Sequence, residues 1–212
     1  MPHLKKRHLF LFITLFFAAL LASCDVAGYL KGQGRIEKNQ ISVTELTLDQ
    51  QNLVRLLSAG KTAHIFNYYI DESFSEKRLW VDIYEYGVLV ETPNFLHTTA
   101  PGNIPLHGQI AIMISQSAST KEYQFTLIFS VSGKIVSAEG LITVIAGDEN
   151  FASASGPMQG IIDIQDEKEI ILHMTKFFRD NVFTDDLQVY AEQPELLAIY
   201  PRVHVVKVQF LR

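Results

Sequence analysis

Three aromatic residues are the best candidates for a binding site in this sequence. Trp80, Tyr84 and Tyr86 share one parity within the apolar run 79–90, so a strand there would carry all three on one face. On an exposed face such a row stacks on sugar rings or accepts a peptide, and on a buried face it forms core. Both interpretations stay open, and we treat the three residues as a possible binding site.

No catalytic residue is recognisable. The sequence has no Gly-x-Ser-x-Gly elbow, and the serine-rich segment 116–119 lacks the flanking glycines that would expose a strained serine. Acids in expected strands, such as Glu85 and Glu139, are candidates for the carboxylate pair of a glycosidase, but a sequence does not show their separation. We therefore favour a non-enzymatic role, with a cell-envelope hydrolase acting on carbohydrate or peptide as the alternative.

The spacing of metal ligands is also absent. No two histidines stand at i and i+4 on a helix, and no acidic segment follows the twelve-residue calcium loop. His97 and His107 flank a proline-punctuated loop and would meet only if it folds back. His64, His173 and His204 fall in expected strands, where we expect their ring nitrogens to be satisfied. Loop acids at 148–150, 163–167 and 185–186 offer oxygens for calcium, but we predict no metal site and no cofactor.

The only cysteine, Cys24, follows a segment with the features of a secretory signal. Lys5, Lys6 and Arg7 form a basic start, and a nearly uninterrupted apolar run covers 9–22. That run is shorter than the roughly 20 residues that a membrane-spanning helix needs. A basic start, a short apolar core and an exit of small residues are typical of a signal peptide.

Leu21-Ala22-Ser23-Cys24 resembles the lipobox of bacterial lipoproteins, in which Leu and small residues precede an invariant Cys. The resemblance covers residues 1–24 only. It implies cleavage between Ser23 and Cys24, covalent diacylglycerol on Cys24, and a lipid-anchored protein on the outer face of the cytoplasmic membrane. Asp25 resembles the signal that retains Gram-negative lipoproteins at the inner membrane. In a Gram-positive cell the lipid would also lie in the cytoplasmic membrane, so both cases give the same location. The alternative is an ordinary secretory cut that leaves Cys24 as a free thiol.

The net charge of the exported part limits the classes of partner that it can bind. Without the three basic residues of the signal peptide, 15 Lys and Arg stand against 23 Asp and Glu, a net charge of about −8. A nucleic-acid binder would need a basic footprint. An acidic chain also has no electrostatic attraction to anionic lipid, so the covalent lipid alone would attach the protein to the membrane. An envelope protein or glycan is the partner that remains.

The pattern of apolar runs and turn signals predicts the organisation of the chain. We expect a signal peptide over 1–23, a tether over 24–40, and a single β-rich extracytoplasmic domain over 41–212. Eight to nine strands without βαβ alternation favour an antiparallel β-sandwich of the jelly-roll or immunoglobulin-like kind. A capping box at 47–50 predicts one short N-terminal helix over about 48–58.

Further boundaries follow from composition. Strands apolar on both faces, such as 61–70 and 79–90, are expected in the centre of a sheet covered on both sides. Segments 123–131 and 135–145 flank Ser132-Gly133-Lys134 and predict a hairpin. We expect loops at 93–105 and 147–160, a helical turn at 175–182 and a second short helix at 192–200. The function that the sequence favours is a membrane-anchored binding or envelope-associated module.

Overall fold

The computed structural model describes residues 36–58, 61–99, 106–116, 122–131, 134–143, 151–179 and 186–212. The expected signal peptide, Cys24 and residues 24–35 of the expected tether lie outside these ranges. Among the residues described, no helix is long and apolar enough to cross a membrane. All the described residues therefore follow the expected lipid anchor at Cys24.

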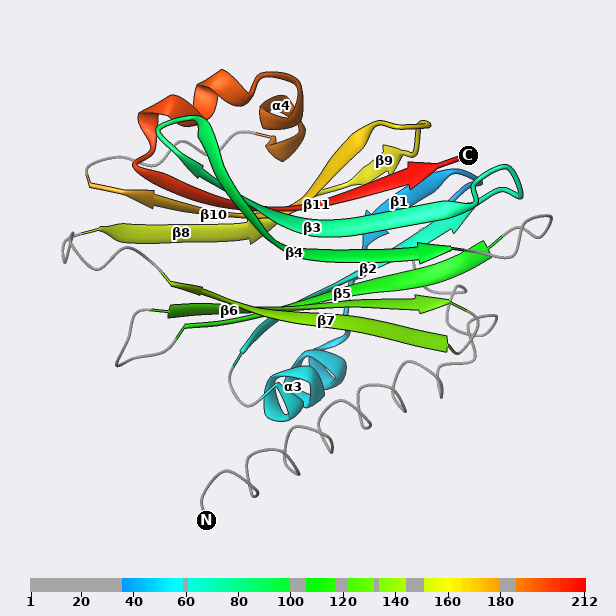
Figure 1. Ribbon diagram of the computed structural model, residues 1–212. Coiled ribbons are helices and arrows are strands. Elements are labelled where there is room, and N and C mark those ends of the chain that lie inside the picture. The colour runs from blue at the N-terminus through cyan, green and yellow to red at the C-terminus, as the bar shows by residue number, and fades with distance from the viewer. Residues whose placement is uncertain are drawn as a thin grey trace, which may run out of the picture.

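Eleven described strands form two antiparallel sheets that face each other, so the expected β-sandwich is confirmed (Figure 1). Sheet A has six strands, in the order β7 (Lys134–Thr143), β6 (Glu122–Val131), β5 (Leu106–Gln116), β2 (Thr62–Ile70), β1 (Gln40–Val43) and β9 (Ile161–Asp163). Sheet B has five, in the order β4 (Val88–Thr99), β3 (Glu76–Glu85), β11 (Arg202–Leu211), β10 (Glu169–Phe178) and β8 (Ala152–Pro157).

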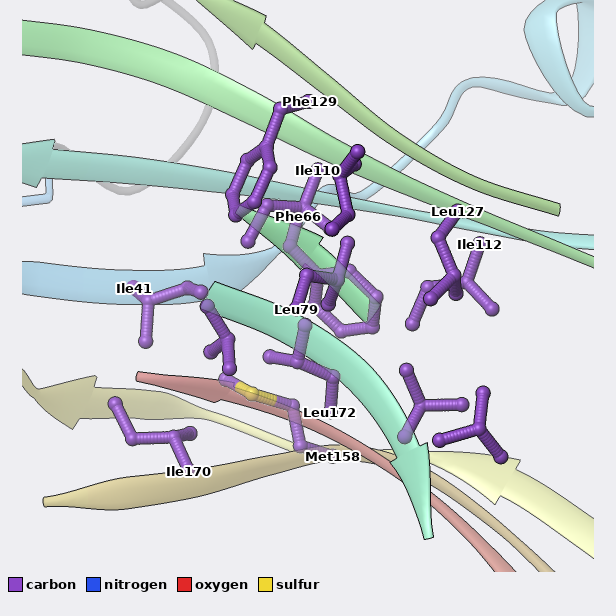
Figure 2. Packing of buried hydrophobic residues seen from close by; sticks show 14 of the residues in the cluster. Ile41, Phe66, Leu79, Ile110, Ile112, Leu127, Phe129, Met158, Ile170 and Leu172 are labelled. Carbon is purple, nitrogen blue, oxygen red and sulfur yellow. The ribbon is translucent and has the colours of Figure 1, made fainter. Parts of the chain in front are cut away.

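Alternate residues of the two sheets point inward and form one apolar core. In sheet A, Phe66 on β2 lies directly opposite Ile110 on β5, and in sheet B, Leu79 on β3 lies opposite Val208 on β11. All four are fully buried in the same cluster. Figure 2 shows side chains from both sheets meeting between the ribbons. Because burial of apolar surface is the dominant favourable term in folding, this core accounts for the pairing of the sheets.

Short helices cover the outer face of each sheet (Figure 1). Helix α3 (Leu48–Leu57) packs Val54 near Ile65 on sheet A. Helix α4 (Leu187–Glu192) and the 3-10 helix η1 (Pro194–Ile199) bury Tyr190 and Leu197 in a cluster with Val205 on sheet B. Strands β2 and β3 are therefore covered on both faces, which confirms the interpretation of their two-sided apolar pattern.

The predicted N-terminal helix is confirmed, including its cap. Thr47 is the N-cap of α3, and it accepts a hydrogen bond from the Gln50 amide at 3.4 Å. The Gln50 side chain accepts in turn from the Thr47 amide at 2.8 Å. A capping box satisfies two of the amides that a helix start leaves unpaired. However, Leu53 and Leu56 of the expected apolar face are exposed.

The predicted strand over 79–90 is wrong, because the chain turns within it. Strand β3 ends at Glu85, and β4 begins at Val88 and returns antiparallel to it. The two residues between them form the turn. Tyr86 therefore does not share a strand with Trp80 and Tyr84.

Two expected loops and one expected helical turn also contain strand. Strand β4 runs through Pro93 to Thr99, and β8 occupies 152–157. Both are edge strands, where proline and small residues are tolerated because one side of the backbone needs no partner. Residues 175–178 continue β10 because they alternate between the two faces. The expected helix at 192–200 is confirmed as η1, whereas α4 was not predicted. Parts of the two expected loops, 100–105 and 147–150, and of the expected helical turn, 180–182, lie outside the described residues.

Candidate functional site

The three candidate aromatic residues lie in two different environments. Trp80 and Tyr84 project from the outer face of β3 and are buried, with 8% and 7% of their surface exposed. Tyr86 follows the end of β3 and is 61% exposed. The structure does not bring the three together as one exposed row, and of the three Tyr86 alone is open to a partner.

Tyr84 belongs to a buried ionic cluster, formed with Asp82, Glu169 and Lys207, that the sequence analysis missed. The Lys207 ammonium donates to Asp82 Oδ2 at 2.9 Å, to Glu169 Oε2 at 2.8 Å and to Tyr84 Oη at 3.0 Å. The Thr92 hydroxyl donates to Asp82 Oδ1 at 2.8 Å. A signal was present in the sequence, because Asp82 interrupts the apolar run 79–84 and Lys207 stands between Val206 and Val208.

The ionic cluster keeps Lys207 in its charged form, in which it cannot act as a nucleophile. Burial alone would lower the pKa of Lys207, but hydrogen bonds to Glu169, Tyr84 and Asp82, with the charge of Asp82, raise that pKa above its ordinary value. Lys207 is therefore protonated, and its three N–H groups have three acceptors. An amine in that state has no lone pair to act as a nucleophile.

The turn between β3 and β4 has an uncommon backbone. Tyr86 has a φ of 48° and Gly87 a φ of 81°. Two positive φ values in a two-residue hairpin are the pattern of a type I′ turn, which favours Asn, Asp and Gly. Gly87 fits this preference, whereas Tyr86 adopts a left-handed conformation that bulky residues avoid.

This turn carries an exposed apolar surface, here called the hairpin tip. It consists of Tyr86, Val88, Leu89 and Val90, with Leu196 and Ile199 of the adjoining η1. Val88 is 65% exposed, Leu89 50%, Val90 49% and Ile199 61%. Figure 1 shows the β3–β4 hairpin beside the α4 and η1 region at one end of the sandwich.

The hairpin tip is fixed to η1 by two contacts. The Tyr86 amide donates to the Tyr200 carbonyl at 3.2 Å. Gly87 approaches η1 so closely that a Cβ added to it would lie 3.0 Å from the Ala198 backbone nitrogen. Because Gly87 also has a positive φ, no other residue fits here without strain. The tip is therefore a positioned surface and not a free loop.

The exposed charges beside the hairpin tip are acidic. Glu91 on β4 and Glu195 on η1 are exposed. Glu85 accepts from the Arg202 guanidinium at 3.0 Å, and Arg202 is largely buried, so that pair contributes little net charge at the surface. An apolar centre with an acidic rim is thus the surface that this end presents.

Histidines form a second group, inside the sandwich, here called the histidine cluster: His64, His173 and His204. The rings of His64 on β2 and His173 on β10 stack across the two sheets with centroids 4.9 Å apart. His204 on β11 lies among the rings of Tyr123 and Phe177, at 5.6 Å and 5.0 Å. His173 and His204 are fully buried.

The histidine cluster is incompletely satisfied, contrary to our expectation. Arg202 donates to His204 Nε2 at 3.2 Å, so neutral His204 carries its proton on Nδ1. Within the described part of the chain, Nδ1 of His173 and of His204 and Nε2 of His64 have no hydrogen-bond partner. Burial first, and neighbouring positive charge second, lowers the pKa of His173 and of His204 to about 3. Both rings are therefore neutral at ordinary pH.

The described residues contain no group of three or more His, Cys, Asp or Glu side chains that could hold a metal ion. His97 contacts Glu76 at 3.1 Å, whereas His107 in the other sheet stacks on Tyr69 at 3.9 Å, so each has its own neighbour. Of the acids considered for calcium, those at 148–150 and Asp185 lie outside the described residues.

Comparison of the chain with protein-family models, curated proteins and solved structures finds no match.

Proposed function

We propose that the protein is a lipid-anchored, non-enzymatic binding module on the outer face of the cytoplasmic membrane, and that the hairpin tip binds another protein of the cell envelope. The observation that carries the proposal is Tyr86, a large aromatic residue that is both strained and 61% exposed.

Folding alone does not account for Tyr86 at this position. A left-handed conformation costs a residue other than Gly about 1–2 kcal/mol. A side chain that is mostly exposed recovers little of that cost through packing. Residues held in a strained backbone conformation are concentrated at functional sites. Tyrosine is also among the residues that contribute most to protein interfaces, because its ring is apolar and its hydroxyl is polar.

The neighbours of Tyr86 support the same proposal. Exposed apolar residues scattered singly are normal on protein surfaces, but a contiguous group marks a site of interaction. Here Val88 and Val90 follow Tyr86 in the chain, and Ile199 lies on the η1 segment that the turn contacts. Such a surface suits the centre of an interface, and the acidic rim suits its edge.

The proposed location rests on the lipobox-like segment that ends at Cys24. Diacylglycerol there would hold the chain at the membrane, and the tether would separate the β-sandwich from the lipid. The net charge of about −8 that the chain carries after removal of residues 1–23 argues against nucleic acid as a partner.

Photocrosslinking in the intact full-length protein tests the proposed tip. With p-benzoylphenylalanine in place of Tyr86, we expect irradiation of cells to give a discrete protein adduct. The same group in place of exposed Gln159, in the β8–β9 connection, is the matched control and should give none. Ile199→Asp should weaken the Tyr86 adduct. Equal labelling from both positions, or none from position 86, would overturn the proposed tip.

The strain at Tyr86 gives a second prediction. Tyr86→Asn should raise the free energy of unfolding by about 1 kcal/mol, because Asn tolerates a positive φ better than Tyr. The same variant should lose partner binding. Urea unfolding and the yield of a photoadduct from position 88 measure the two effects. Tyr86→Phe, which keeps both the ring and the strain, is the control and should change neither by much.

The anchor gives a third prediction. Cys24→Ala should abolish incorporation of labelled fatty acid and leave the precursor uncleaved, because the thiol is the only group that can receive the lipid. Intact mass of the membrane-extracted protein measures both. Normal maturation and labelling of this variant would contradict the anchor while leaving the proposal for the hairpin tip untouched.

A further inference from the structure

Strand β4 has a free edge at the hairpin tip. It is the last strand of sheet B, and among the strands that the structure describes, β3 alone pairs with it. Val88, Leu89 and Val90 are consecutive and all exposed. Since consecutive strand residues point to opposite faces, Val88 and Leu89, which pair regularly with β3, leave both faces of the strand uncovered there. Natural edge strands are normally protected by charges, proline or bulges. Residues 88–90 carry no charge or proline, and the register with β3 shifts at Val90, so the regular exposed edge is Val88 and Leu89, ahead of that irregularity.

The turn fixes which backbone groups this edge offers. Glu85 lies directly opposite Val88, and Tyr84 opposite Leu89. Residues that flank a two-residue turn form the closing hydrogen-bonded pair of the hairpin. In an antiparallel ladder the next residue points its N–H and C=O away from the neighbouring strand. Leu89 therefore presents one donor and one acceptor to a further strand.

The charges beside this edge select among possible occupants. Glu91 and Glu195 are exposed, and the nearby Arg202 is held by Glu85. Such a rim disfavours anionic lipid and favours a segment that carries Lys or Arg. The apolar side chains on both faces of β4 favour apolar residues in that segment as well.

We propose that the partner binds by strand addition: an extended segment with apolar residues and flanking Lys or Arg pairs with β4 at Val88 and Leu89. This inference rests on the proposed function, because it specifies how the hairpin tip binds a protein. In this mode main-chain hydrogen bonds provide affinity, and the side chains on each face provide specificity.

Two variants of one residue separate strand addition from contact through side chains. Leu89→Pro removes the outward N–H and also trims the side chain, whereas Leu89→Ala trims the side chain and keeps the N–H. With p-benzoylphenylalanine at position 86, Leu89→Pro should lower the yield of the protein adduct about tenfold or more, because a partner carbonyl loses its donor. Leu89→Ala should lower it by less than about threefold.

The outcomes distinguish the inference from the proposed function. Equal losses in the two Leu89 variants, or an adduct with lipid instead of protein, would overturn strand addition. No adduct in the chain with an intact Leu89 would instead refute the proposed function itself. If Leu89→Pro lowers the melting temperature, a test of the acidic rim replaces it. Glu195→Lys and 0.5 M NaCl should each lower the adduct yield at least about threefold. If neither does, strand addition by a basic segment is wrong.

Discussion

Acidification from pH 8 to pH 5 is expected to lower the free energy of unfolding, with His173 and His204 together contributing about 4 kcal/mol, about 2 kcal/mol each. Burial lowers the pKa of both rings from 6.5 to about 3 in the folded chain. Below pH 6.5 the unfolded chain therefore takes up protons that the folded chain does not accept until about pH 3. Stability is thus complete above pH 6.5 and falls as the pH falls. Urea unfolding at a series of pH values measures the slope.

The surroundings of the two rings support this direction. A proton on His173 would face His64, whose own pKa is lowered by burial, and a proton on His204 would lie beside the Arg202 guanidinium. The Arg202 guanidinium is itself paired with Glu85 at 3.0 Å. Exposed carboxylates remain ionised above pH 5, so the window from pH 6.5 to pH 5 isolates the histidines.

A pair of variants tests the assignment to the histidine cluster. His173→Leu should remove a large part of the pH dependence between pH 8 and pH 5, whatever it does to stability at pH 8. The remainder comes from His204 and from His64 and His107, whose pKa values burial also lowers. Leu172→Val is the matched control, because it trims the neighbouring buried residue of β10 without removing a titrating group, and it should leave the slope unchanged. A slope that His173→Leu does not reduce would contradict the assignment.

Features that depend on neighbouring residues could be predicted from the sequence. The capping box of α3 and the hairpin formed by β6 and β7 are specified by residues a few positions apart, and both are confirmed. Strand β8 was missed because its sequence, Ala-Ser-Ala-Ser-Gly-Pro, has no apolar alternation. It is a strand because it pairs with β10, and that pairing is set by the tertiary fold.

The candidate site was predictable only in part, for the same reason. Parity correctly placed Trp80 and Tyr84 on one face, but α4 and η1, which bury Tyr84, come about 100 residues later. The turn at Tyr86 was missed because Tyr is not a turn residue, and its positive φ is held by the contact of Gly87 with η1. The histidine cluster joins β2, β10 and β11, which no local pattern connects.

Removing Asp82 from the ionic cluster is expected to cost about 3–5 kcal/mol, because it leaves a buried ammonium without its buried counter-ion. The Asp82 and Lys207 side chains are 6% and 9% exposed, and their 2.9 Å contact joins β3 to β11. In Asp82→Leu, Lys207 keeps Glu169, which is 42% exposed and therefore partly screened by water. Urea unfolding at pH 7.5 measures the loss. Glu72→Gln, which breaks the exposed pair between Lys38 and Glu72, is the control and should leave the stability nearly unchanged, because water screens that pair.

The double variant Asp82→Leu with Lys207→Met separates charge from packing. If the loss in Asp82→Leu comes from an unpaired charge, removing Lys207 as well should restore most of the stability, since apolar pairs often replace buried ion pairs without cost. If the double variant is as unstable as Asp82→Leu, the loss comes from packing, and the charges are not what joins β3 to β11. Restored stability together with an undiminished photoadduct from position 86 would mean that the ionic cluster supports the sheet beneath the hairpin tip and takes no part in binding.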